Sequence, residues 1–208
     1  GTMGGPALAD ILYGKVSPSA RLPVTWPKSV GQIPIYYNHK NTGRPPVEDQ
    51  FIYMDDIPVE AVQYSTGNTS HYLDIGFKPE FPFGYGLTYS RFEYKDIRLD
   101  KRKIKPGETV TVSAVVRNTG RRTATETVQL YIQDVAAHIT RPVRELKAFE
   151  QVTLQANESR KVRFTLHTDE LSYFDNQGEL HLQPGLFNVW VAPNAAEGLQ
   201  TSFTLLKN

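Results

Sequence analysis

The stretch FPFGYGLTYS, Phe81–Ser90, divides this chain into two parts with different sequence patterns. Before it lies a proline-rich segment with a single helix signal. After it, short segments of alternating polar and apolar residues follow one another to the end of the chain. Such alternation is typical of strands that bury one face. The sequence therefore predicts a mainly β protein with one complete β-domain after the dividing stretch.

The second part contains at least six predicted strands: Thr109–Val116, Thr127–Ile132, Arg144–Val152, Lys161–Leu166, Leu186–Val191 and Thr201–Leu205. Turn signals accompany them at Lys105–Glu108, Asn118–Gly120 and Gln183–Gly185. Short strands joined by turns predict an antiparallel β-sandwich of the immunoglobulin-like kind. Four aromatic residues within these strands are expected in its core, namely Phe149, Phe164, Phe187 and Trp190.

The first part begins with one predicted helix. Pro6 suits the first helical position, and Gly14 suits the end of the helix. Apolar residues at spacings of three and four predict one buried face, formed by Ala7, Leu8, Ile11 and Leu12. The segment Leu22–Pro27 is bounded by prolines and suits an edge strand. The next fifty residues carry prolines and tyrosines without a sustained period, which is typical of a segment that is functional or packs on a partner surface.

Composition excludes several classes of protein. The chain has 208 residues, enough for one large domain or two small ones. Its net charge is +1, with 23 basic and 22 acidic residues, which argues against nucleic-acid binding and against a polybasic membrane patch. No apolar run approaches the length of a transmembrane helix. Cysteine is absent, so disulfides and thiolate zinc sites are excluded.

No self-contained catalytic motif is present. The sequence has no phosphate-binding glycine loop, no HExxH, no GxSxG and no EF-hand pattern. Its five histidines show no ligand spacing, so no residue is assigned as a metal ligand and no cofactor is expected, while metal binding itself stays open. The acidic pairs Glu48-Asp49 and Asp55-Asp56 are interpreted as solvated loop charges, because neighbours on an extended chain point to opposite faces.

The densest polar and aromatic cluster is YYNHKNTGRP, Tyr36–Pro45. Aromatic faces together with Asn, His and Arg donors suit carbohydrate recognition, because sugar C–H faces pack on rings and hydroxyls form directional hydrogen bonds. The alternative is a turn whose tyrosines dock on a neighbouring domain. The residues alone favour the second interpretation.

Four motifs, in this order, resemble the C-terminal portion of glycoside hydrolase family 3 enzymes, and bacterial periplasmic β-glucosidases in particular. They are Gly4–Pro27, Val30–Pro45, Phe81–Tyr89 and Arg141–Glu150. The resemblance implies that residues 1–80 are the end of an α/β sandwich domain with its connector. Residues 81–208 would then be the junction and a fibronectin-III-like domain.

The resemblance also implies a function. Such enzymes are retaining, exo-acting glycosidases that use an Asp nucleophile on a TIM-like barrel and a carboxylic acid from the second domain. Neither group has a counterpart here, so we expect no catalytic residue in this chain and no activity from it alone. Tyr37, His39, Asn41 and Arg44 are the expected sugar-binding residues. The expected substrate has a terminal β-D-glucosyl residue, although xylose or N-acetylglucosamine specificity stays open.

The expected partners are the N-terminal barrel and α/β domain of the same enzyme, on the same or a separate chain. A lone helix and one edge strand would leave Ala7, Leu8, Ile11, Leu12 and Trp26 exposed without them. A homodimer and a periplasmic or secreted location are further expectations. The alternatives are a non-catalytic immunoglobulin-like module that binds carbohydrate or protein, and a purely structural domain.

Overall fold

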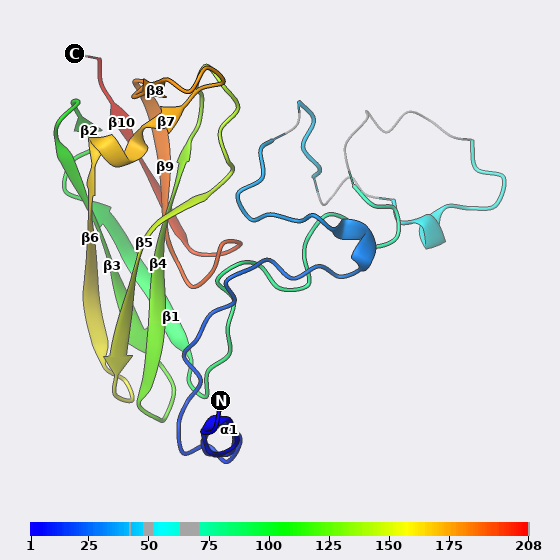
Figure 1. Ribbon diagram of the computed structural model, residues 1–208, viewed down its shortest axis with the longest axis vertical. Helices are drawn as coiled ribbons and strands as arrows, with labels where there is room; N and C mark the ends of the chain where they lie inside the picture. Colours follow the sequence, from blue (N-terminus) through cyan, green and yellow to red (C-terminus); the bar gives the residue numbers. More distant parts are fainter. Residues whose placement is uncertain (42, 48–51, 63–70, 208) are drawn as a thin grey trace.

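The computed structural model describes residues 1–41, 43–47, 52–62 and 71–207. Its main body is a β-sandwich, and the N-terminal part of the chain extends to one side of it (Figure 1). This architecture confirms the predicted mainly β fold. Within the described ranges, no helix combines the length and the hydrophobicity that a membrane span needs.

Two largely antiparallel sheets face each other in the sandwich. The smaller has the order β1 (Phe92–Leu99), β3 (Thr109–Asn118), β6 (Ser159–His167). The larger has the order β2 (Lys103–Ile104), β10 (Leu199–Leu205), β9 (Gly185–Ala192), β4 (Ala124–Asp134), β5 (Glu145–Leu154), with β2 and β10 parallel. The short helix η4 (Thr168–Leu171) leads into a small hairpin of β7 (Tyr173–Phe174) and β8 (Leu180–His181).

All six predicted strands are present, since each coincides with β3, β4, β5, β6, β9 or β10. Strand β1 was not predicted because its burial does not alternate, and its register with β3 shifts between Lys95 and Arg98. Asp96 in that shift has a positive φ of 56°. The predicted turn at Gln183–Gly185 is wrong, because Gly185 already begins β9.

The core lies between the sheets and contains Phe164 and Phe187, which are 6% and 1% exposed. Trp190 is buried on the outer face of the larger sheet, in a second cluster with Tyr131. The prediction of a buried Phe149 is wrong, because its side chain is 65% exposed. Phe149 pairs with Gln129 across β4 and β5 and therefore also points to the outer face, on an edge strand.

The N-terminal part has little regular structure. Helix α1 spans Gly4–Leu12 and is followed by Gly14 with a φ of 73°, as predicted, but Pro6 is its third residue rather than its first. None of the residues of α1 is buried, as expected for a helix without its partner. The predicted edge strand at Leu22–Pro27 is wrong, because only Trp26 forms an isolated bridge, to Phe81.

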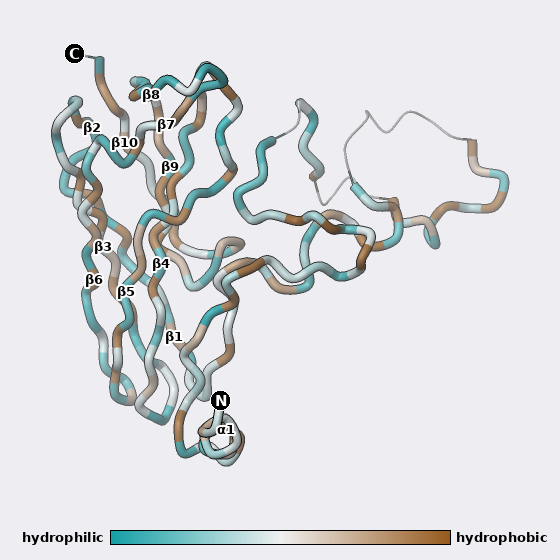
Figure 2. The backbone as a smooth tube through the Cα atoms, viewed as in Figure 1, coloured by the Kyte–Doolittle hydropathy of each residue, from teal (hydrophilic) through white to brown (hydrophobic). Residues whose placement is uncertain are grey.

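Among the residues of the connector that the structure describes, two short helices are present, η1 (Val30–Gln32) and η3 (Met54–Asp56). Figure 2 shows hydrophobic stretches in this extension, away from the sandwich. Val59 and Val62 are 95% and 72% exposed there. The extension therefore carries apolar surface that the sandwich does not cover.

The dividing stretch FPFGYGLTYS lies against both the N-terminal part and strand β4. Gly84 has a φ of 78°, and a Cβ atom on it would lie 2.2 Å from Oε1 of Gln129. A Cβ atom on Gly86 would lie 2.4 Å from the carbonyl oxygen of Ala20. Both glycines are therefore required by close backbone approach, and Gly84 also by its backbone conformation.

A buried ion pair joins the N-terminal part to the sandwich. Nη2 of Arg21 lies 2.7 Å from Oε2 of Glu126, and the two side chains are 11% and 2% exposed. The hydroxyl of Tyr94 donates to Oε1 of the same carboxylate at 2.8 Å. Burial raises the pKa of Glu126, and this effect exceeds the lowering by Arg21. Burial also raises the pKa of Tyr94, so its hydroxyl stays a donor.

Removal of Arg21 should therefore destabilise the fold strongly. Arg21→Ala leaves a carboxylate buried without its cation, and we expect a loss of about 3–5 kcal/mol in the free energy of unfolding, measured in urea. Adding Glu126→Gln should recover part of this loss, because a neutral amide costs less to leave buried. Arg160→Ala is the matched control. Its pair with Glu158 is exposed, so the expected loss is about 1 kcal/mol or less. Equal losses for Arg21→Ala and Arg160→Ala would contradict the assignment.

Two turns of the sandwich share one design. In each, a glutamate side chain accepts a hydrogen bond from the backbone N–H three residues earlier: Lys105 to Glu108 at 2.7 Å, and Gln155 to Glu158 at 2.8 Å. The residue before each glutamate has a positive φ, Gly107 in one turn and Asn157 in the other. These backbone hydrogen bonds lower the pKa of both carboxyls below the ordinary value of 4.5.

Glutamates with a lowered pKa stabilise the fold above their unfolded-state pKa, and this contribution is lost as the pH falls through the folded-state value. The double variant Glu108→Gln, Glu158→Gln should therefore unfold at a lower temperature than the parent chain at pH 7. The gap should close as the pH falls below 4.5. Thermal unfolding followed by circular dichroism at pH 7, 5 and 3 measures it. A gap that stays constant, or widens in acid, would show that the carboxylate charge does not stabilise these turns.

Candidate functional site

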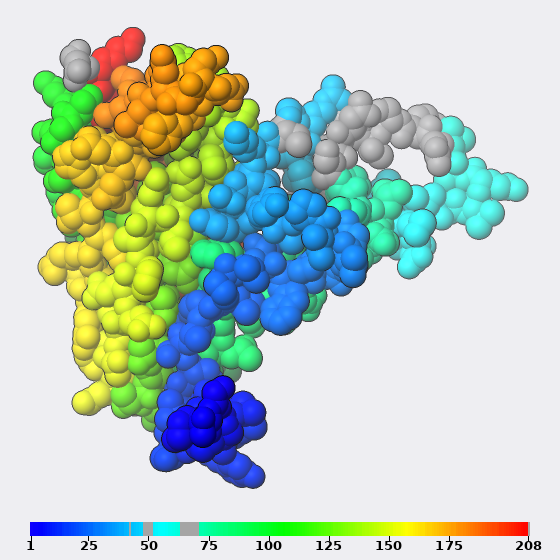
Figure 3. Space-filling view, viewed as in Figure 1, coloured from blue at the N-terminus to red at the C-terminus, as the bar shows by residue number. Residues whose placement is uncertain are grey.

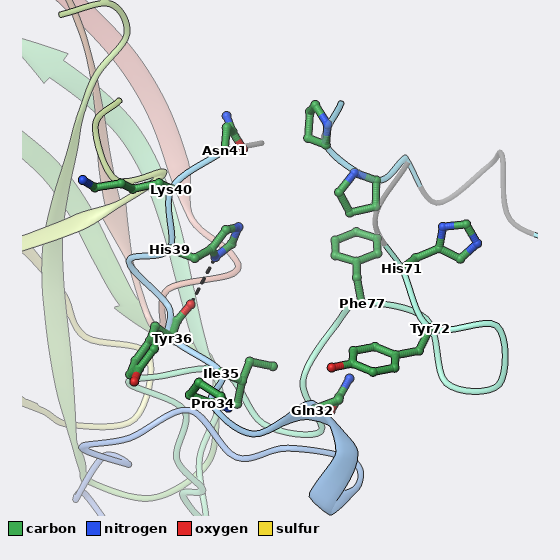
Figure 4. A pocket seen from close by; sticks show the side chains of 12 residues that line it. Gln32, Pro34, Ile35, Tyr36, His39, Lys40, Asn41, His71, Tyr72 and Phe77 are labelled. Carbon is green, nitrogen blue, oxygen red and sulfur yellow. Dashed lines mark hydrogen bonds between the residues drawn. The ribbon is translucent and has the colours of Figure 1, made fainter. Parts of the chain in front are cut away.

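A hollow of about 460 Å³ lies in the connector, between two segments that are far apart in sequence (Figure 4). Its lining residues are Gln32, Pro34, Ile35, Tyr36, His39, Lys40, Asn41, Pro45, Pro46, His71, Tyr72 and Phe77. Two of the four expected sugar-binding residues, His39 and Asn41, are among them. In Figure 4 the His39 ring faces the hollow from one side, and Phe77 and Tyr72 face it from the other.

One wall of the hollow is tethered to the sandwich. The carbonyl oxygen of His39 accepts a hydrogen bond from the backbone N–H of Val143 at 2.9 Å, and Lys40 forms an isolated bridge with Pro142. Nδ1 of His39 is hydrogen-bonded to the carbonyl oxygen of Tyr36 at 3.1 Å, which fixes the ring. The Arg141–Glu150 motif therefore positions the loop that carries His39.

The other wall is braced within the connector. Gln32 is 3% exposed, and its side chain accepts from the backbone N–H of Lys28 and donates to the carbonyl oxygen of Lys78. The hydroxyl of Tyr72 donates to the carbonyl oxygen of Gly31 at 2.7 Å. A buried glutamine and a tyrosine hydroxyl thus hold the two segments together where no sheet does.

Tyr37 lies elsewhere. Its ring is stacked on Phe83 with a centroid distance of 4.2 Å and lies edge-on to Tyr131 at 6.1 Å. Its hydroxyl accepts a hydrogen bond from the backbone N–H of Leu146 at 3.3 Å. Tyr37 therefore docks on the outer face of the sandwich and does not line the hollow. Arg44 is exposed and also does not line it.

Sequence reasoning missed the aromatic wall formed by Tyr72 and Phe77. Both residues follow His39 by more than thirty positions, and no periodic pattern links them to it. The sequence therefore did not indicate that they line the same hollow. The tyrosines and phenylalanines of the connector were a compositional signal, but only the fold shows which of them face the hollow. An aromatic wall opposite His and Asn side chains suits a sugar ring.

A second polar group, Asp175, Glu179 and His181, was also missed. Their ligand atoms lie within 4.8 Å of one another, the spacing of a metal site. However, Asp175 accepts from the backbone N–H groups of Gln177 and Glu179, and its other oxygen is hydrogen-bonded to Nε2 of His181 at 2.8 Å. The bond from Glu179 is the main cause of the lowered pKa of Asp175. We interpret the group as the closure of the β7–β8 hairpin.

Comparison with known proteins agrees with this geometry. Residues 1–89 match the glycosyl hydrolase family 3 C-terminal domain, and residues 126–195 match the fibronectin type III-like domain. The chain belongs to glycoside hydrolase family 3 and corresponds to the C-terminal portion of its members. This confirms the resemblance seen in the four sequence motifs.

Individual members of family 3 match along nearly the whole chain. A periplasmic β-glucosidase of Salmonella typhimurium is 41% identical over 99% of the chain, which covers 25% of that protein. A putative β-xylosidase of Formosa agariphila is 35% identical over 98% of the chain and 24% of its own length. A crystal structure of a Listeria innocua β-glucosidase with gluconolactone aligns at a TM-score of 0.84 with 38% identity, covering 97% of this chain and 26% of that one. This family 3 chain spans about a quarter of the length of the curated relatives it matches.

The docked position of Tyr37 predicts that its substitution lowers the free energy of unfolding. Tyr37→Ala removes the stacked ring and should lower the free energy of unfolding by about 3 kcal/mol. Tyr37→Phe loses only one long hydrogen bond, so about 1 kcal/mol or less is expected. Tyr36→Ala is the matched control, because its side chain is 62% exposed and should change stability by about 0.5 kcal/mol at most. Urea titrations measure all three. A Tyr37→Ala variant as stable as Tyr36→Ala would refute the docking role.

Proposed function

We propose that this chain is the C-terminal portion of a retaining, exo-acting β-glucosidase that releases terminal β-D-glucosyl residues. The observation that carries the proposal is the likeness to a named β-glucosidase over 99% of the chain at 41% identity. No residue of this chain is given a catalytic role. The nucleophile and the acid/base belong to the barrel and the α/β domain of the same enzyme, on the same or a separate chain.

The exposed apolar residues of the N-terminal part support a partner surface. In α1 and just after it, Leu8, Leu12 and Tyr13 are 57%, 68% and 91% exposed. Trp26 and Val30 are further exposed apolar residues of this part, at 53% and 84%. Figure 3 shows α1 standing away from the sandwich, so the sandwich does not cover it. Apolar surface of this kind fits the remainder of an α/β domain.

The hollow in the connector supports a place for the sugar. In the proposal, His39 and Asn41 supply hydrogen bonds, and the aromatic wall opposite them packs on the sugar face. Arg44 contributes from the rim, and Tyr37 acts by fixing the loop on the sandwich. The putative β-xylosidase among the relatives keeps xylose as the alternative sugar. A periplasmic or secreted location is proposed from the Salmonella relative, and a homodimer stays a prediction.

The alternative is a non-catalytic module that binds glycans on the sandwich itself. The observation in its favour is the exposure of two rings, Phe149 on β5 and Phe174 on β7. These strands belong to different sheets, so the rings do not form one platform. A glycan-binding face needs neighbouring rings, and the enzyme portion is therefore the better-supported proposal.

Activity measurements test the proposal directly. The chain alone should not hydrolyse p-nitrophenyl β-D-glucoside, whereas the longer protein that contains it should. Hydrolysis by the isolated chain would contradict the proposal that the nucleophile and the acid/base lie in the barrel and the α/β domain. Absence of β-glucosidase activity in the longer protein, with β-xylosidase activity instead, would replace glucose by xylose.

The role of the loop has its own test in the longer protein. His39→Ala and Arg44→Ala should each raise KM for disaccharides about 5- to 10-fold, the effect of losing about one hydrogen bond. Lys161→Ala on β6 is the control for a surface change on the far sheet. Unchanged KM values would assign the loop to docking alone and leave the β-glucosidase proposal intact.

A further inference from the structure

Three partly or largely buried arginines in or against the sandwich differ in how their charge is neutralised. Arg21 is paired with Glu126 at 2.7 Å. Arg141 lies over the ring of Tyr173, with its Cζ 4.4 Å from the centroid, and is paired with Glu145 at 3.0 Å. Both side chains are about 10% exposed, and each has a carboxylate partner, as a buried cation needs.

Arg144 also lies over an aromatic ring, but it lacks a carboxylate partner among the described residues. Its Cζ lies 4.5 Å from the ring centroid of Trp190, and Nη1 donates to the carbonyl oxygen of Glu197 at 2.8 Å. Among the residues that the structure describes, no carboxylate lies within 4 Å of its guanidinium. The side chain is half-buried, and burial lowers its pKa. A guanidinium has five N–H donors, so most of its hydrogen-bonding capacity is unused by protein partners.

A second hollow, of about 500 Å³, lies beside this guanidinium, between the connector and the sandwich. Arg144 lines it, but Trp190 does not. Arg144 therefore contacts the indole and also contributes to the wall of the hollow. The remaining walls are mainly apolar, formed by Ile35, Pro82, Phe83, Val143 and Ala195 with further aromatic rings.

Other charged groups lie at the edge of the second hollow. They are Lys78, Glu80 and Glu197, and the side chains of all three are exposed to solvent. Water screens these charges, whereas the half-buried charge of Arg144 is screened less. Arg144 therefore supplies the least exposed of these charges in the lining of the hollow.

We propose that the second hollow binds a small aromatic carboxylate. Its carboxylate pairs with the free N–H groups of Arg144, and its ring packs against the apolar walls. The bound carboxylate would give Arg144 the partner that Glu126 gives Arg21 and Glu145 gives Arg141. A volume of this size is within the usual range for small-molecule sites. The site adjoins the proposed sugar hollow, with which it shares Ile35, Tyr36, His39 and Phe77, and it does not depend on which glycoside is hydrolysed.

Calorimetric titration of the full 208-residue chain with benzoate tests this proposal, with benzamide as the uncharged analogue. Benzoate should bind saturably and benzamide at least about tenfold more weakly. Arg144→Gln should weaken benzoate binding roughly 10- to 100-fold and leave benzamide binding unchanged. Arg160→Gln, which alters an exposed and paired arginine, is the matched control and should change neither.

Fluorescence gives a second readout that separates binding from loss of fold. The chain has two tryptophans, so Trp26→Phe leaves Trp190 as the single reporter next to Arg144. Benzoate should change its emission in the Trp26→Phe chain, and unfolding curves should show that Arg144→Gln stays folded.

Four results would overturn the proposal. The first is no saturable benzoate binding, and the second is equal binding of benzoate and benzamide. Tighter binding of glucuronate than of benzoate would assign the site to a sugar acid instead. Benzoate binding that is lost in the longer protein would show that a carboxylate side chain of that protein fills the hollow, which also rejects a ligand site.

Discussion

The attachment of the N-terminal part to the sandwich depends on the buried carboxylate of Glu126. Strand β9 pairs with β4 only from Gln129 onward, so the interior beside Glu126 has no neighbouring strand on that side. Arg21 enters there from the N-terminal part and neutralises the carboxylate, while Tyr94 donates from the opposite sheet. A charge that is 2% exposed must be paired, so the sandwich needs the segment around Arg21 for its own stability.

Strand β4 provides further anchors along its outward face. The side chain of Gln129 donates to the carbonyl oxygen of Gly84, and Tyr131 lies against the docked ring of Tyr37. Thr127 donates to the carbonyl oxygen of Ser19. The expected domain boundary between residues 80 and 81 stays a prediction. However, these contacts attach parts of the N-terminal segment to the outer face of the larger sheet.

The alternation of polar and apolar residues predicted the strands, because a strand that buries one face places every second side chain in the core. The same pattern gave no prediction where burial does not alternate along the strand. Strand β1 contains a register shift, so its burial does not alternate. Phe149 shows the other limit: alternation tells which residues share a face, but not whether another segment covers that face. The sequence cluster around His39 was recognised from its residue types, whereas its wall of Tyr72 and Phe77 depends on contacts between distant segments.

The sandwich therefore controls the geometry of the loop that carries His39. The described residues of the connector form little regular structure, and the position of His39 depends on a backbone hydrogen bond to Val143 and on the docked Tyr37. Val143 and Arg144 are adjacent, so one loop of the sandwich both tethers the first hollow and lines the second. Because both hollows share that loop, occupation of the second hollow would act on the same backbone that holds His39, which lines both hollows.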